Sequence, residues 1–296
     1  FGLGGAPGDV VRRVVDIDEV GVGQGLVRCG RLKLQRGRQL VVVDVDELGG
    51  VAGLGGDFDA VIVLVVNGAQ ARQVILGQGG VADRIAPGGA IMVSCTQSAD
   101  DARALGADLA ARGVLMLDAP VSGGAAKAAQ GAMTVMASGP DAAFDALAPV
   151  LEAVAAKTYR IGPDIGQGAT VKVIHQLLAG VHIAVGAEAM ALAARAGIPL
   201  DTMYDVVTNA AGNSWMFENR MKHVVDGDYT PTSAVDIFVK DLGLVTETGR
   251  ALGFPLPLAS AAFAMFQQAS NMGHGREDDS AVIKTFSGIT LPEGKA

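Results

Sequence analysis

The sequence predicts an α/β domain with a doubly wound parallel sheet, followed by an all-α domain, with one long interdomain helix joining the two. Three observations support this prediction. Short apolar strands alternate with helical patterns up to residue 161, one long apolar helix pattern spans residues 166–197, and only helical patterns follow residue 200. Such alternation is typical of right-handed crossovers and of a parallel sheet that carries helices on both faces.

The first domain follows from the order of its strands and helices. Ala60–Val66 is a continuous β-branched run of the kind buried in parallel sheets, and Asn67-Gly68 ends it. The other predicted strands are Val20–Val22, Leu40–Val45, Ala90–Ser94, Val114–Asp118, Met133–Ala137 and Lys157–Ile161, and the predicted helices are Ala69–Ile85, Ala99–Arg112 and Asp141–Ala153. Ligands bind beyond the carboxyl ends of such strands, so we expect functional loops at Asn67–Ala69, Thr96–Ser98 and Ala119–Gly124.

The long helix is predicted between Gly166 and Gly197, and we expect it to be mostly buried. Its apolar residues recur at three- and four-residue steps, namely Val171, Ile174, Leu177, Leu178, Val181, Val185, Ala189 and Leu192. Pro163 and Pro199 flank it. At ~1.5 Å per residue it spans over roughly 40 Å, enough to connect two domains. We therefore divide the chain into residues 1–164 and 165–296, with the helix opening the second domain.

The second domain is predicted to be all-α and to provide substrate and dimer contacts. Helical patterns occur at about 201–211, 214–226, 236–252, 257–271 and 278–284, with Pro or Gly between them. Trp215 and Phe217 are expected to pack inside it. Because the long helix has more apolar surface than one small domain covers, we expect a homodimer or homotetramer.

Composition excludes several classes of function. The chain has 296 residues, half of them hydrophobic, and a net charge of −8 without basic tracts, so nucleic acid is not an expected partner. No signal peptide and no uninterrupted apolar run of ~18 residues is present, so we expect a cytoplasmic protein without a membrane span. Cys29 and Cys95 lie far apart without CxxC spacing, which favours a reducing compartment and no metal site.

A lysine in the first turns of the long helix is a candidate for catalysis. Lys172 lies near the positive end of the helix dipole, between Val171 and Val173, and both surroundings should lower its pKa. His175 and Gln176 follow at three and four residues and share its helix face. A lysine that snorkels from a helix end is the plainer interpretation of the same pattern.

A Rossmann-type domain needs a glycine turn after its first strand to approach the pyrophosphate of a dinucleotide. One candidate is Gly2-Leu3-Gly4, and the other is the turn around Gly23, with Asp44 or Asp46 following at the spacing of a ribose-binding acid. The first lies 65 residues before Asn67 and the second 44, and only the longer distance accommodates the βα units. We therefore favour Gly2, Leu3 and Gly4 as cofactor-binding residues.

Three separated motifs resemble the β-hydroxyacid dehydrogenase family, which includes 3-hydroxyisobutyrate, tartronate semialdehyde and 6-phosphogluconate dehydrogenases. They are Asp118–Gly124 (DAPVSGG), Gly168–Lys172 (GATVK) and Phe238–Asp241 (FVKD), in the family's order. The resemblance covers about residues 57 to 290. Within the family, segments 175–180 (HQLLAG), 211–216 (AGNSWM) and 275–282 (GREDDSAV) most resemble the L-threonate dehydrogenase branch.

The resemblance implies an oxidoreductase that transfers hydride between a small 2- or 3-hydroxy acid and NAD, with NADP as a possible cofactor. Lys172 would be the general acid/base. Ser122, Gly123, Gly124, His175 and Gln176 would bind the substrate, and Val66, Asn67, Thr96 and Lys240 would join Gly2, Leu3 and Gly4 in binding the cofactor. His175 occupies a position that is usually Asn in relatives, and a histidine can also donate a hydrogen bond to the substrate.

Two other functions use the same architecture. One is a reductase that works on a semialdehyde or an imine, and the other is a nucleotide-binding module without catalysis. Imine reductases and the non-catalytic modules tend to lack the lysine, so Lys172 speaks against both.

Residues 5–56 do not resemble the family, although both flanking segments do. Read one nucleotide out of phase, segments such as Gly8–Asp16 and Gly49–Gly56 could encode family-like sequence. Our hypothesis is that this stretch is a frame-shifted reading. Resequencing of the gene tests it, and an in-frame read that encodes these same residues would end it.

Overall fold

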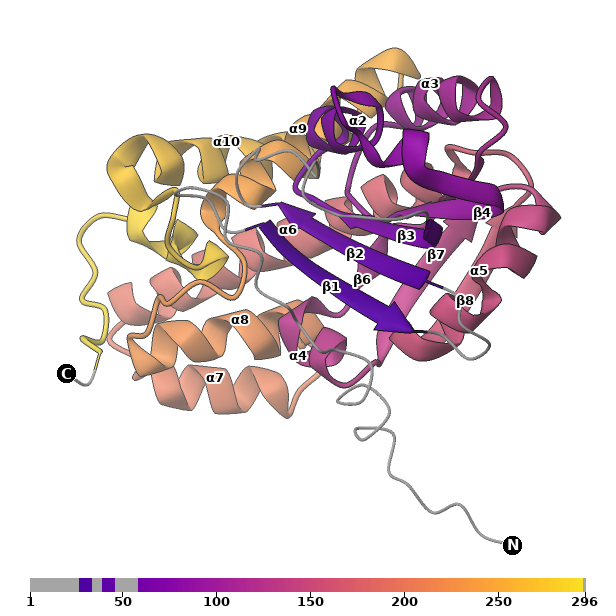
Figure 1. Cartoon of the computed structure of the whole chain (residues 1–296). Coiled ribbons are helices and arrows are strands. Elements are labelled where there is room, and N and C mark those ends of the chain that lie inside the picture. Colours follow the sequence, from indigo (N-terminus) through magenta and orange to yellow (C-terminus); the bar gives the residue numbers. More distant parts are fainter. Residues whose placement is uncertain (1–26, 34–38, 46–57, 295–296) are drawn as a thin grey trace, which may run out of the picture. The chain divides into compact units, whose positions relative to one another are not determined.

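The computed structural model describes residues 27–33, 39–45 and 58–294. The chain divides between Lys172 and Val173 into two compact units (Figure 1). The first unit contains a sheet with helices, and the described part of the second is helical apart from its loops and one isolated bridge. The glycine turns predicted at Gly2–Gly4 and at Gly23, the strand at Val20–Val22 and Asp46 lie outside the described residues.

The sheet of the first unit is mixed, with parallel strands at its centre and both parallel and antiparallel pairs toward its edges. Its order is β1-β2-β3-β4-β5-β7-β6, and β8 pairs with β7. The strands are β1 (Val27–Lys33), β2 (Gln39–Val45), β3 (Phe58–Leu64), β4 (Ile85–Val93), β5 (Leu115–Asp118), β6 (Val121–Ser122), β7 (Met133–Ser138) and β8 (Ala155–Gly162). Strands β2 to β5 are parallel, as predicted. The antiparallel pairs β1–β2, β5–β7 and β6–β7, and the strands β1 and β6 themselves, were not predicted.

Helices cover both faces of this sheet, which confirms the doubly wound prediction. Val61 and Val63 of β3 pack with residues of α2 (Gly68–Leu76) and α3 (Ala99–Ala110). The alternate residues Ala60 and Ile62 pack instead with α5 (Asp141–Val154). Because neighbouring residues of a strand point to opposite faces, a continuous apolar run is needed to serve both helix layers. Figure 1 shows α2 and α3 on one side of the sheet and α5 on the other.

The helix predicted at Ala69–Ile85 is too long. It ends at Leu76, a short 3-10 helix follows at Val81–Arg84, and Ile85 already belongs to β4. The reason is the glycine cluster after Leu76. The N–H of Gly77 closes the last turn on Gln73 O, and a Cβ on Gly80 would lie 2.4 Å from Ile75 O. A second short helix, α4 (Gly124–Ala129), was not predicted.

The second unit consists of helices, as predicted. Its elements are most of α6 (Gln167–Arg195), then α7 (Leu200–Thr208), α8 (Trp215–Asp226), α9 (Val235–Ala251), α10 (Pro257–Ala269), a π-helical turn at Ser270–His274 and a 3-10 helix at Asp279–Thr285. Phe217 lies in its core, as predicted. Trp215 does not: it is 58% exposed, because it opens α8 on the side away from the core.

Helix α6 is less buried than expected. Ile174, Leu178, Val185 and Leu192 are each more than half exposed, whereas Ile183, Met190 and several alanines face the core. Apolar residues surround the whole helix, so their period could not identify the buried face. By length and composition α6 could also cross a membrane, with half of its most apolar 18 residues buried. A core helix of a globular protein passes the same test, so this is weak evidence of a span.

A buried ion pair in the second unit should make stability depend on pH. Arg220 Nε lies 2.8 Å from Oδ1 of Asp279, whose side chain is fully buried. Burial raises the pKa of Asp279 to about 7, and Arg220 opposes the rise. A raised carboxyl pKa gives stability that is present below the unfolded value of 3.8 and is lost as pH rises through 7.

We therefore predict that the wild-type protein loses stability relative to Asp279→Asn as pH rises from 4 to 7, by at most ~1.4 kcal/mol per pH unit. Unfolding by urea at pH 5, 6 and 7 measures this difference. Glu247→Gln, which removes an exposed carboxylate from α9, is the control and should show no such trend. A difference that grows in favour of the wild type would show that Asp279 folds as a carboxylate.

Candidate active site

The loops predicted to be functional in the first unit meet at one edge of the sheet. The parallel strands β3, β4 and β5 are adjacent and end together. Beyond the strand ends, Ser94 N–H donates to Val63 O and Ala119 N–H donates to Val93 O. The segments that begin at Asn67, Thr96 and Ala119 therefore leave the sheet at the same edge, where ligands of such folds bind.

Asn67 organises the first of these loops. Its Oδ1 accepts the N–H of Gln70 at 2.9 Å, while Oε1 of Gln70 accepts the N–H of Val66 at 2.9 Å. This reciprocal arrangement satisfies backbone donors at the start of α2 and fixes the path of the chain. The side-chain oxygen of Asn67 therefore acts as the N-cap of α2.

The second loop contains a buried amide that sequence analysis did not identify. Gln97 is 2% exposed, and neither polar atom of its side chain has a partner within the part of the chain that the structure describes. It packs against Gly68, where a Cβ would lie 2.9 Å from Gln97 Oε1. An isolated Gln in a loop carries no sequence signal. Buried amides are normally hydrogen-bonded, so this edge fits a polar ligand such as a dinucleotide.

The third loop depends on two glycines. It follows β6, which ends at Ser122, and Gly123 and Gly124 have φ values of 142° and 66°. A Cβ on Gly123 would lie 2.8 Å from the Cβ of Lys127. Only glycine adopts this pair of conformations at low cost, and successive N–H groups in such a turn form a concavity suited to an anion.

The start of α6 is anchored to the same edge by buried side chains. Oδ2 of Asp118 accepts the N–H groups of Gly166 and Ala169, each at 2.9 Å. Oγ of Ser138 accepts the N–H of Gly168 at 2.9 Å and donates to Asp118 Oδ2 at 3.3 Å. Burial raises the pKa of Asp118, and the backbone bonds oppose the rise. The sequence predicted where this helix begins but not what holds it.

Lys172 is the sixth residue of α6 and is 7% exposed, so the structure buries it as predicted. A cation that is itself buried in the first turns of a helix loses hydration and gains nothing from the dipole. Its place therefore favours a functional lysine over one that snorkels to solvent.

Three other predicted residues meet in the second unit around Asp241. This carboxylate is 2% exposed, accepts from Gln176 Nε2 at 2.6 Å, and lies 2.6 Å from Lys240 Nζ. Because Asp241 only accepts, the Gln176 amide turns Oε1 toward His175 Nδ1, 3.0 Å away. Neutral His175 then carries its proton on Nδ1. The sequence analysis included Asp241 in the motif Phe238–Asp241. Only the fold shows that its carboxylate connects Gln176 with Lys240.

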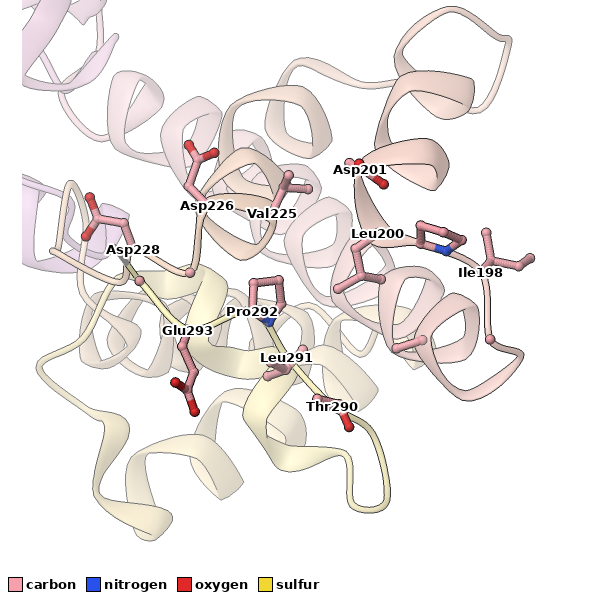
Figure 2. Close-up of a pocket in the computed structure, with 15 residues that line it drawn as sticks. Ile198, Leu200, Asp201, Val225, Asp226, Asp228, Thr290, Leu291, Pro292 and Glu293 are labelled. Atoms are coloured by element: carbon pink, nitrogen blue, oxygen red, sulfur yellow. The ribbon is translucent and has the colours of Figure 1, made fainter. Parts of the chain in front are cut away.

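A groove of the second unit lies elsewhere. It measures about 1000 Å³ and lies between the end of α6, the end of α8 and residues 290–294. Figure 2 shows the carboxylates of Asp201, Asp226, Asp228 and Glu293 around it. It contains none of the predicted site residues. A groove with four carboxylates repels an acid substrate, so we do not assign it to one.

Two families match the chain. Residues 39–162 match the NAD binding domain of 6-phosphogluconate dehydrogenase, and residues 166–286 match the NAD-binding domain of NADP-dependent 3-hydroxyisobutyrate dehydrogenase.

Similar proteins are known by sequence and by structure. L-threonate dehydrogenase of Escherichia coli K12 is 72% identical over 238 residues, 80% of this chain and 79% of that protein. L-threonate dehydrogenase of Cupriavidus necator is 54% identical over 282 residues, 93% of this chain and 95% of that protein. A 3-hydroxyisobutyrate dehydrogenase structure from Salmonella typhimurium has a TM-score of 0.77 at 68% identity, covering 80% of this chain and 82% of that one. A structure of Mycobacterium tuberculosis 3-hydroxyisobutyrate dehydrogenase with L-serine has a TM-score of 0.69 at 30% identity, covering 79% of this chain and 81% of that one.

Proposed function

We propose, since this chain belongs to the β-hydroxyacid dehydrogenase family, that it oxidises L-threonate with NAD and uses Lys172 as the general acid/base. That it is an NAD(P)-dependent hydroxyacid dehydrogenase follows from its relatives. The observation that carries the proposed mechanism is the burial of Lys172 on a helix whose start is hydrogen-bonded to Asp118. Asp118 is also the first residue of the segment that contains Ser122–Gly124. The proposal assigns residues 1–164 to the dinucleotide and 165–296 to substrate and subunit contacts, in a cytoplasmic enzyme.

The proposed mechanism gives each residue one task. Ser122 and the N–H groups of Gly123 and Gly124 hold the substrate carboxylate. Neutral Lys172 takes the proton of the substrate hydroxyl at Nζ. The nicotinamide dinucleotide, when bound, would supply the acceptor for the hydride of the carbinol carbon. Gly2, Leu3, Gly4, Val66, Asn67, Thr96 and Lys240 are the residues proposed to bind that cofactor.

The polar neighbours of Lys172 favour a polyhydroxy acid. L-threonate carries more hydroxyl groups than 3-hydroxyisobutyrate, which carries a methyl group instead. His175 and Gln176, held in place by Asp241, offer polar atoms to such hydroxyls. The methyl group of 3-hydroxyisobutyrate makes no hydrogen bond to these side chains, whereas a hydroxyl group at that position can.

We predict that L-threonate with NAD has the highest kcat/KM in a panel of L-threonate, D-glycerate and 3-hydroxyisobutyrate with NAD and NADP. An acid at the end of the second strand of such domains selects NAD by binding the ribose hydroxyl. Absorbance of the reduced cofactor measures every combination. A higher kcat/KM with NADP, or with 3-hydroxyisobutyrate, would contradict the corresponding part of the proposal.

Replacement of Lys172 should abolish proton transfer but spare cofactor binding. Lys172→Ala removes general acid–base catalysis, so we predict a loss of ~10²–10⁴ in kcat with little change in NAD affinity. Lys172→Arg should fail almost as badly, because a guanidinium does not release its proton near neutral pH. Wild-type kcat/KM should rise with pH at an apparent pKa well below the ~10.4 of a free lysine.

Steady-state kinetics and NAD titration of the purified variants test this assignment. If Lys172→Ala kept more than about a tenth of wild-type kcat, we would abandon it, given the ~10²-fold minimum expected. Loss of NAD binding alone would indicate a structural lysine.

Assembly into a homodimer or homotetramer is part of the proposal. Ile174, Leu178, Val185 and Leu192 follow each other at steps of four, seven and seven residues, so their exposed side chains form one stripe along α6. Such a stripe is typical of a helix that packs on another subunit.

We predict that light scattering at micromolar concentration gives a dimer or tetramer and that Leu178→Glu weakens this assembly. Leu252→Glu, at an exposed leucine directly after α9, is the control, and a monomeric wild type would contradict the prediction.

The other functions considered differ in measurable ways. A semialdehyde or imine reductase would consume reduced cofactor with the carbonyl or imine compound and leave L-threonate unoxidised. A non-catalytic module would bind NAD but turn over none of the acids. Buried Lys172 favours the dehydrogenase over an imine reductase and over a non-catalytic module.

A further inference from the structure

We propose that Asp118 is a positioning residue that acts on catalysis through Lys172. Its carboxyl group fixes the start of α6 on the sheet and thereby fixes the helix turn that carries the lysine. This inference rests on the proposed role of Lys172.

The hydrogen bonds at the start of α6 account for every backbone donor there. An α-helix leaves its first four N–H groups without helical partners. In this helix Gly166 and Ala169 donate to Asp118, Gly168 donates to Ser138 Oγ, and Gln167 donates to Asp164 O at 3.3 Å. Two side chains from the sheet thus satisfy three of the four donors. Both are fully buried, so water cannot replace them.

The contact between the sheet and the helix is also sterically close. A Cβ on Gly168 would lie 2.6 Å from Met136 O and 2.7 Å from Asp118 O. The helix backbone therefore approaches the strands as closely as glycine permits. Ala169, which donates to Asp118, precedes Lys172 by three residues, less than one helical turn. A shift of the helix start would move Lys172 with it.

Asp118 acts as a hydrogen-bond acceptor and not through its charge. Burial raises the pKa of this carboxyl group, and one oxygen, Oδ1, has no partner among the described residues. Both backbone bonds go to the other oxygen, which accepts in either protonation state. An Asn side chain keeps one such oxygen, so it should support the helix almost as well.

The first measurement compares Asp118→Ala with Asp118→Asn. We expect Asp118→Ala to lower kcat by about 10- to 100-fold, the effect of a misplaced catalytic group, with NAD affinity unchanged. Asp118→Asn should recover most of the loss. Asp141→Ala is the control, because Asp141 starts α5 but is exposed. Should Asp118→Ala not fold, Ser138→Ala removes the Gly168 bond and the longer 3.3 Å bond to Asp118, keeps both backbone bonds to Asp118, and should lower kcat by a smaller factor.

A double-mutant cycle with Lys172→Ala shows whether Asp118 acts through the lysine. If it does, Asp118→Ala lowers the residual kcat of Lys172→Ala no further, because the group it positions is already absent. A loss as large as in the wild-type background would overturn the inference. So would an Asp118→Asn variant as slow as Asp118→Ala.

Hydrogen exchange of the protein without cofactor supplies a readout that is independent of activity. Backbone amides at 166–169 should exchange faster in Asp118→Ala than in the wild type or in Asp118→Asn. If Lys172→Ala stays active, the proposed function fails, whatever the exchange shows. If Lys172→Ala is inactive but Asp118→Ala keeps full kcat, only the present inference fails.

Discussion

The packing of the α6 N-terminus against the carboxyl edge of the sheet is the constraint on which the site depends. A buried helix end without partners is unfavourable, so its donors must meet acceptors supplied by the strands. Asp118 and Ser138 supply them from β5 and β7. The same segment continues from Asp118 into the glycine loop at Gly123 and Gly124. One short stretch of chain thus fixes both the candidate anion loop and the helix that carries Lys172.

Much of this arrangement could be predicted from the sequence. The β-branched run at Ala60–Val66 identified a buried parallel strand, and the loops after three strands were placed correctly at one edge. Lys172 was predicted near the start of a long helix, where the structure buries it. These features are local, since each follows from residues that are close in the sequence.

The partners of these residues could not be predicted, because they come from distant segments. Gly166 and Ala169 lie 48 and 51 residues from Asp118, and Gln176 lies 65 residues from Asp241. The antiparallel strand β7 inserts between β5 and β8, and no apolar pattern distinguishes its direction. Gln97 became notable only through its burial. The glycine fingerprint at Gly2–Gly4 lies outside the described residues, so the pyrophosphate site stays a prediction.

Helix α6 serves three surfaces, which explains why its pattern was ambiguous. Ile183 and Met190 face the core of the second unit, Ile174 and Leu192 are exposed, and Lys172 and Gln176 are buried polar groups. A helix with one apolar face would serve only one of these surfaces. These two buried polar groups lie within five consecutive residues near its start, where the dipole and the sheet edge act together. The helix therefore separates chemistry near its N-terminus from apolar packing along its remaining length.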